Sequence, residues 1–188
     1  MGLQDKIKQN KKAISERCFN LIADTYPPAT SLLLKREKDK FLNPVGYTIQ
    51  NEMETIFDEL TGEMNSNRLY TALENIIKIR AVQDFSPSEA IGFVFLLKEA
   101  VRETVRSGER RAESGEHRLK GLRGLPSNES IGGQGSGVKD NETEIFEELI
   151  EFEQRIDRIA LMAFDIYMKC REKIYEIKIK EAEGVYGK

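Results

Sequence analysis

Seven consecutive non-polar residues, from Ile91 to Leu97, constrain the fold of this chain more than any other feature. A helix that is apolar on every face must be buried on every side, so the run predicts a central core helix. Gly92 lies inside it and costs roughly 1 kcal/mol relative to alanine, which predicts that a neighbouring helix approaches closely. The run contains no side chain equipped for catalysis.

The start of this core helix can be predicted from local chemistry. Ser86 is expected to accept a hydrogen bond from the amide of Glu89, whose carboxylate reaches back to the amide of Ser86. Pro87 suits the first helical position, where no N–H donor is needed. The sequence therefore predicts a helix that begins at Pro87, after a short turn that ends the preceding helix.

Apolar residues elsewhere also recur at helical spacing, and few segments show the alternation of a strand. Asn43 and Pro44 have the residue types of a helix cap and a first helical position, and Gly62 is a plausible end. We predict helices over about 3–25, 29–36, 44–61 and 67–82. The fold class expected is an all-α bundle of five to six helices, or a globin-like arrangement without haem, in a single domain over residues 1–188.

Composition excludes several classes of function. The net charge of -3 over 188 residues gives no reason to expect nucleic acid as the main partner. The chain has no apolar leader and no apolar run of membrane-spanning length, so we expect a cytoplasmic protein without membrane insertion. Its two cysteines, Cys18 and Cys170, lie among apolar residues at helical spacing, which favours buried free thiols in a reducing compartment.

The segment at about 107–141 contains eight glycines among Ser, Arg and Glu residues, and apolar residues are sparse. We interpret it as a long flexible loop. Gly132 and Gly137 have the spacing of a phosphate-binding loop, but Val138 stands where that motif needs lysine, so nucleotide binding is not expected.

The last helix is predicted over 142–182 and would be on the order of 60 Å long. Its apolar residues recur in heptads, and the run Ile159–Phe164 is apolar on all faces, so it should pack on Ile91–Leu97. Acidic residues gather near its start and basic residues near its end. Beyond the core the helix remains amphipathic, which predicts contact with a second copy or with a partner protein. The residues we expect in this interface are Cys170, Ile174, Tyr175, Ile177 and Lys178.

Three segments carry a family resemblance: Asn43-Pro44-Val45-Gly46, IKIRAVQDFSPSEAIGFVFLLKEAVRE and EFEQRIDRIALMAFDIYMKCREKIYEIKIKE. Together they resemble the RsbRD N-terminal domain family, named after RsbT co-antagonist proteins of bacterial stress signalling. The resemblance implies an all-helical domain that receives a signal and passes it on through its last helix, usually to an output domain that follows. Because no such domain follows here, we expect a stand-alone member that signals to a separate regulatory or output protein.

The sequence lacks the residue patterns of common catalytic and cofactor sites, so we expect a protein that is not an enzyme and has no cofactor. The one histidine, His117, lies in the Gly-rich segment, which disfavours a catalytic triad, a zinc site and haem held by a core histidine. Two alternatives for the function stay open. The first is a regulatory module, expected as a homodimer; the second is a small-molecule or lipid-tail carrier with an apolar cavity between the two core helices. Separately, polar residues beside the apolar runs are interpreted as the lining of a small pocket: Arg80, Asp84, Arg155 and Asp157.

Overall fold

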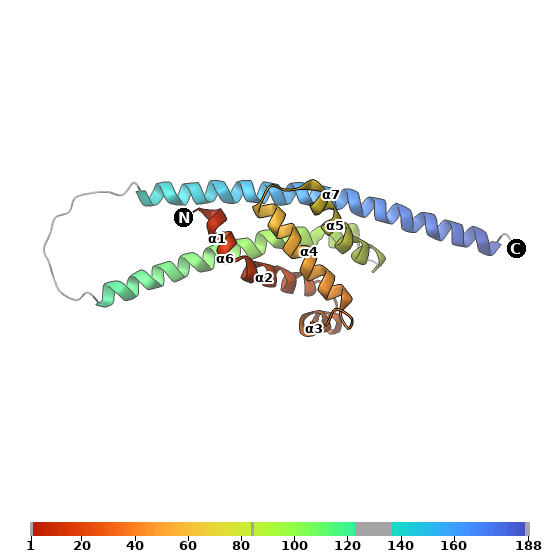
Figure 1. The fold of residues 1–188 in the computed structure, drawn as a ribbon, viewed down its shortest axis with the longest axis horizontal. Coiled ribbons are helices and arrows are strands. Elements are labelled where there is room, and N and C mark those ends of the chain that lie inside the picture. Colours follow the sequence, from red (N-terminus) through yellow and green to blue (C-terminus); the bar gives the residue numbers. More distant parts are fainter. Residues whose placement is uncertain (1, 84, 123–136, 187–188) are drawn as a thin grey trace.

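The computed structural model describes residues 2–83, 85–122 and 137–186, and it describes side chains outside 108–144 and 185–186. Seven helices and no strand are found in these residues (Figure 1). They are α1 (Leu3–Gln9), α2 (Lys11–Ala23), α3 (Pro28–Arg36), α4 (Pro44–Thr61), α5 (Ser66–Val82), α6 (Pro87–Leu122) and α7 (Gly137–Tyr186). The predicted all-α class is therefore confirmed. The first predicted helix is divided in two at Asn10, whose side chain donates to the carbonyl of Lys6 at 2.8 Å.

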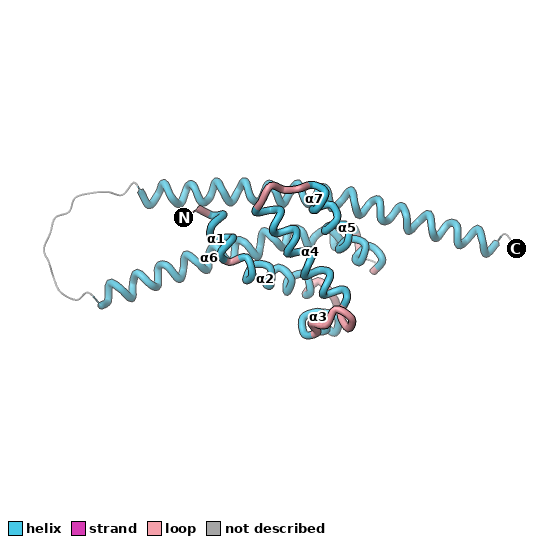
Figure 2. Tube along the Cα trace, in the orientation of Figure 1, coloured by secondary structure: helices cyan, strands magenta, loops and turns pink. Residues whose placement is uncertain are grey.

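Helices α6 and α7 form the long axis of the molecule and run antiparallel, as Figure 1 shows. Two ion pairs set their register: Lys98 with Asp157 at 2.6 Å, and Arg102 with Glu153 at 2.6 Å. Helix α2 packs on α6 and α5 on α7, α4 contacts both α2 and α5, and α3 contacts α2 and α4 but neither long helix. Short loops join these helices (Figure 2).

Local caps hold the ends of the helices as the sequence predicts. The amide of Ser86 donates to the Glu89 carboxylate at 2.9 Å, and the amide of Glu89 donates to Ser86 Oγ at 3.3 Å. Hydrogen bonds from the hydroxyl of Ser86, at 2.6 Å, and from its amide to the Glu89 carboxylate lower the pKa of Glu89. At the start of α4, Asn43 Oδ1 accepts from the amide of Gly46 at 2.9 Å. Both predicted helix starts are thus confirmed.

The prediction that the two apolar runs are buried on every side is wrong. Phe93, Val94 and Leu97 are buried in the core, but Phe95 is 46% exposed. On α7, Leu161 is 71% exposed. The reason is that each long helix has too few neighbouring helices: α6 packs mainly on α2 and α7, and α7 mainly on α5 and α6. One face of each apolar run therefore stays exposed to solvent.

The predicted flexible loop at about 107–141 is also wrong at both of its ends. Helix α6 continues to Leu122, and α7 already begins at Gly137. Glycine costs only about 1 kcal/mol per position, whereas the intervening Glu, Arg, Ala, Lys and Leu are strong helix formers, so the backbone tolerates isolated glycines. The rest of the predicted loop, 123–136, lies outside the described residues.

Two expectations from composition concern the cysteines and the membrane. Cys18 is buried, and burial raises the pKa of its thiol to about 12. Cys170 is a free thiol at intermediate exposure, so full burial is confirmed for Cys18 alone. In the part of the chain that the structure describes, no helix combines the length and apolar character needed to cross a bilayer.

Two helical glycines lie in opposite environments and allow a test of the packing. A Cβ at Gly92 would meet nothing within 4 Å, which contradicts the close approach expected from the sequence. A Cβ at Gly46 would clash with the side-chain amide of Asn43, whose nitrogen is held by bonds to the carbonyls of Leu34 and Glu37.

We therefore expect Gly92→Ala to raise the free energy of unfolding by up to about 1 kcal/mol, because alanine favours the helix. Gly46→Ala should lower it by about 1–3 kcal/mol through overpacking. Urea unfolding followed by circular dichroism measures both variants. A destabilising effect of Gly92→Ala would mean that a neighbour lies closer to this face of α6 than the structure places it.

Candidate functional site

Helix α7 extends past the core, and its projecting part is the candidate site. Its buried side chains run from Phe152 to Tyr167, and no side chain described after Cys170 is buried. Figure 1 shows the C-terminal part of α7 leaving the other helices behind. A helix that continues for several turns without a core to cover it presents its faces to other molecules.

A hollow of about 380 Å³ lies where α7 leaves the body, between this helix and α5. Its apolar lining comes from both helices and includes Ala81, Val82, Ile166, Cys170 and Ile174. Its charged lining alternates in sign and consists of Glu74, Lys78, Lys169, Glu172, Lys173 and Glu176. An apolar floor between charges of both signs fits an amphipathic helix from a partner protein.

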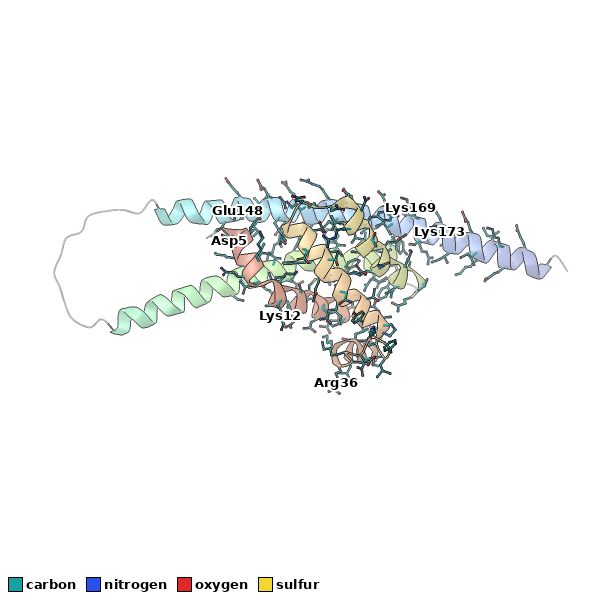
Figure 3. The ribbon with its side chains drawn as sticks, in the orientation of Figure 1. Asp5, Lys12, Arg36, Glu148, Lys169 and Lys173 are labelled. Atoms are coloured by element: carbon teal, nitrogen blue, oxygen red, sulfur yellow. The ribbon has the colours of Figure 1, made fainter. Side chains whose placement is uncertain are left out.

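The charged side chains of the hollow are partly engaged with their own chain. Lys78 forms an ion pair with Glu74 at 3.1 Å, and the ammonium of Lys169 lies 5.7 Å from the ring centroid of Tyr70. Figure 3 shows Lys169 and Lys173 on α7 where this helix leaves the shorter helices. Exposed ion pairs of this kind contribute little to stability, so they can exchange for a partner's charges at small cost.

The structure brings together two of the five residues predicted for the interface. Cys170 and Ile174 line the hollow, and their side chains are partly buried. Tyr175 and Ile177 are more than half exposed on the following turn, next to the exposed Lys178. The guanidinium of Arg171 donates to the hydroxyl of Tyr175 at 3.1 Å. The residues predicted for the interface thus begin in the hollow and continue along the exposed turns of α7.

Of the four residues predicted to form a polar pocket, the three that the structure describes have separate partners. Arg155 donates to the carbonyl of Leu60 at the end of α4, at 3.2 Å. Asp157 pairs with Lys98 across the α6–α7 contact. Arg80 is enclosed between α2, α5 and α6, and Asp84 lies outside the described residues.

The fully buried Arg80 is bound by aromatic rings and by neutral oxygens. Its guanidinium lies 4.0 Å from the ring centroid of Phe85 and 5.2 Å from that of Tyr26. It donates to Thr25 Oγ1 at 3.2 Å and to the carbonyl of Glu89 at 2.9 Å. Burial lowers the pKa of Arg80 and raises that of Tyr26. Among the described residues, no carboxylate forms an ion pair with this buried cation.

A second exposed surface of α7 was, apart from Tyr175, not predicted from the sequence. We call it the outer stripe, because its side chains lie on the side of α7 away from the core and are all between 42% and 71% exposed. It consists of Phe146, Ile150, Leu161, Phe164, Met168, Tyr175 and Ile179. Steps of three, four or seven residues between most of its members are the sequence signal by which it could have been found.

Comparison with known proteins identifies a family. The sequence model of the family described as RsbT co-antagonist protein rsbRD N-terminal domain matches residues 12–122. The match covers more than half of this chain and ends before α7. A protein of Archaeoglobus fulgidus, named only as an uncharacterized protein, is 46% identical over 38 residues. This match covers 20% of the present chain and 25% of the length of that relative. No solved structure matches the chain significantly.

Proposed function

The chain belongs to the family of RsbT co-antagonist protein rsbRD N-terminal domains, and from this premise we propose that it is a non-enzymatic regulator that acts through contacts with other proteins. The family is one of signalling regulators. In this proposal the protein works in the cytoplasm, in signalling of the bacterial stress type. The bundle receives a signal, and α7 passes it to a separate regulatory or output protein.

The single observation that carries the proposal is the projecting part of α7 with the hollow at its base. The turns after Cys170 add little to the core, because none of their described side chains is buried and only Ile174 among them packs against it. Ile174 and Ile177 continue the apolar seam of the core into solvent. We propose that a partner helix lays its apolar face along this seam and its charged residues against Lys169 and Lys173.

The module is further proposed to be a homodimer. This part of the proposal is supported by the outer stripe, which lies on the side of α7 away from the hollow and stays free when a partner occupies the hollow. Helix α7 can therefore take a second copy on one side and a partner on the other.

Native mass spectrometry of protein purified gently from its own cells tests this function. We expect the chain to carry a second protein that is lost from the variant Ile177→Glu, because a charge would enter the apolar seam. The matched control Leu161→Glu, on the opposite side of α7, should keep that second protein. Ile177 and Leu161 are both exposed, so neither variant should disturb the fold.

Two results would contradict the proposal. The first is a bound protein that Ile177→Glu retains, because the seam would then not be its docking site. The second is a bound small molecule on a chain without any protein partner. This result would favour the alternative function, a small-molecule or lipid-tail carrier with an apolar cavity between the core helices.

A further inference from the structure

We propose that the outer stripe joins two copies of this chain, with their α7 helices antiparallel and related by a two-fold axis near Met162 and Ala163. The inference rests on the proposed function, in which the module is a homodimer, and it names the face, the direction and the register of the contact. It is carried by three observations: the position of the stripe on one face, its internal symmetry, and the distribution of charge along α7.

The stripe occupies one narrow face of α7. At about 100° per residue, its seven members fall within a sector roughly 60° wide. Cys170, Ile174 and Ile177 lie on the opposite side of the helix, where the core seam and the hollow are. The stripe spans 146–179, a length of about 50 Å, which is long enough for a coiled-coil contact between two helices.

The sequence of the stripe is symmetric about the point between Met162 and Ala163. We pair the residues that lie the same number of positions before and after this point. In three of these pairs both residues are apolar, and in a fourth an apolar residue is paired with an acidic one. The four pairs are Leu161 with Phe164, Ile150 with Tyr175, Phe146 with Ile179, and Met168 with Asp157. In an antiparallel two-fold contact each member of such a pair faces the other member on the second copy. A different partner would not require this symmetry, so the symmetry favours self-association.

Charge favours the same direction. Residues 145–161 carry five acidic and two basic side chains, whereas residues 164–180 carry five basic and three acidic ones. A parallel pair would place the acidic halves together and the basic halves together. The antiparallel pair places each acidic half beside the basic half of the other copy, and this complementarity selects the direction of pairing.

Helix α6 supports the centre of the stripe and neutralises its acids. Asp157 and Glu153 are in register with the stripe, and Lys98 and Arg102 of the same chain already pair with them. Because α6 and α7 are antiparallel, Phe95 on α6 and Leu161 on α7 both lie about one turn from the Lys98–Asp157 pair, toward the same end of the contact. Phe95 is 46% exposed and so widens the apolar face at the symmetry axis. Self-association therefore buries aromatic and aliphatic side chains without an uncompensated carboxylate at the centre.

The first test is the mass of the full chain in solution, measured by light scattering and sedimentation over a dilution series. We expect a dimer, and we expect Leu161→Glu to weaken it by at least about 100-fold, since the two new carboxylates would be buried near the axis without partners. The matched control Ile177→Glu, on the opposite side of α7, should leave the dimer intact. A monomeric wild-type chain, or a dimer that Leu161→Glu leaves unchanged, overturns the proposal.

The second test measures direction and register with a short bis-maleimide crosslinker. Ile150→Cys and Tyr175→Cys chains with different tags, both carrying Cys170→Ser, are produced together. Crosslinks are expected between Ile150→Cys and Tyr175→Cys chains. They are not expected between two Ile150→Cys chains, whose thiols would lie on the order of 40 Å apart. Crosslinking of Ile150→Cys with itself indicates a parallel pair and overturns the proposal.

These tests separate the failure of this inference from that of the proposed function. A dimer that survives Leu161→Glu, together with a partner lost through Ile177→Glu, overturns the outer-stripe contact and leaves the docking function standing. A dimer lost through Leu161→Glu, together with a partner retained by Ile177→Glu, supports the outer stripe and contradicts the docking function.

Discussion

Replacing Arg80 with alanine is expected to lower the free energy of unfolding by about 3 kcal/mol. The side chain is fully buried, and the hydroxyl of Thr25 and the carbonyl of Glu89 accept hydrogen bonds from it. Alanine would leave a cavity among Tyr26, Phe85 and Phe93, and would leave that hydroxyl and carbonyl without their donor. Urea unfolding followed by circular dichroism measures the loss.

The matched variant is Arg80→Met, which fills much of the same volume without a charge. Burying a guanidinium without a carboxylate costs desolvation energy, and methionine avoids this cost while it keeps contact with the rings. We therefore expect Arg80→Met to lose less than half as much free energy as Arg80→Ala. Equal losses in the two variants would show that the charge, rather than the packing, provides the stability.

Arg80 matters for the proposed signalling because of what it joins. It extends from α5 to Thr25 after the end of α2 and to the first turn of α6. The hydroxyl of Tyr167 on α7 donates to the carbonyl of Phe85 at 3.1 Å, in the same α5–α6 junction. A displacement of this junction would therefore shift α2, α6 and α7 together, because specific hydrogen bonds in a packed core join the junction to these helices.

Sequence alone predicted the features that depend on local chemistry. Ser86 with Glu89 and Asn43 with Gly46 form the predicted caps, because capping bonds join residues only three positions apart. The all-helical class and the family resemblance were predicted correctly as well. Cys170 and Ile174 were predicted to belong to an interface beyond the core because the last helix stays amphipathic there, and both line the hollow.

Features that depend on how many neighbours surround a helix were not predictable in the same way. Periodicity shows that Phe95, Leu161 and Phe164 are apolar, but it does not show that too few helices are present to cover them. The contribution of Tyr70 and Lys78 to the hollow was missed because it depends on how α5 packs against α7. Arg80 and Arg155 were predicted to share a pocket, yet the fold carries them to separate partners.

A chain that ends at Cys170 is expected to fold and yet to lose both proposed contacts. The deletion removes no described side chain that is buried, so the free energy of unfolding should change by no more than about 1 kcal/mol. It removes the apolar seam from Ile174 onward, where the partner is proposed to dock. It also removes Tyr175 and Ile179, which are proposed to face Ile150 and Phe146 of the second copy. We therefore expect a folded monomer without a bound partner.

The matched control is a chain that ends at Ala182, which keeps the seam and the whole outer stripe. Circular dichroism and urea unfolding check the fold of both chains, light scattering gives their mass, and native mass spectrometry detects the partner. If the chain that ends at Cys170 remains a dimer, the contact must lie on residues that precede the projecting turns. If it also keeps its partner, the projecting helix has no part in either contact. Loss of dimer and partner in this chain, with both retained in the longer control, would show that both contacts require the turns between Cys170 and Ala182.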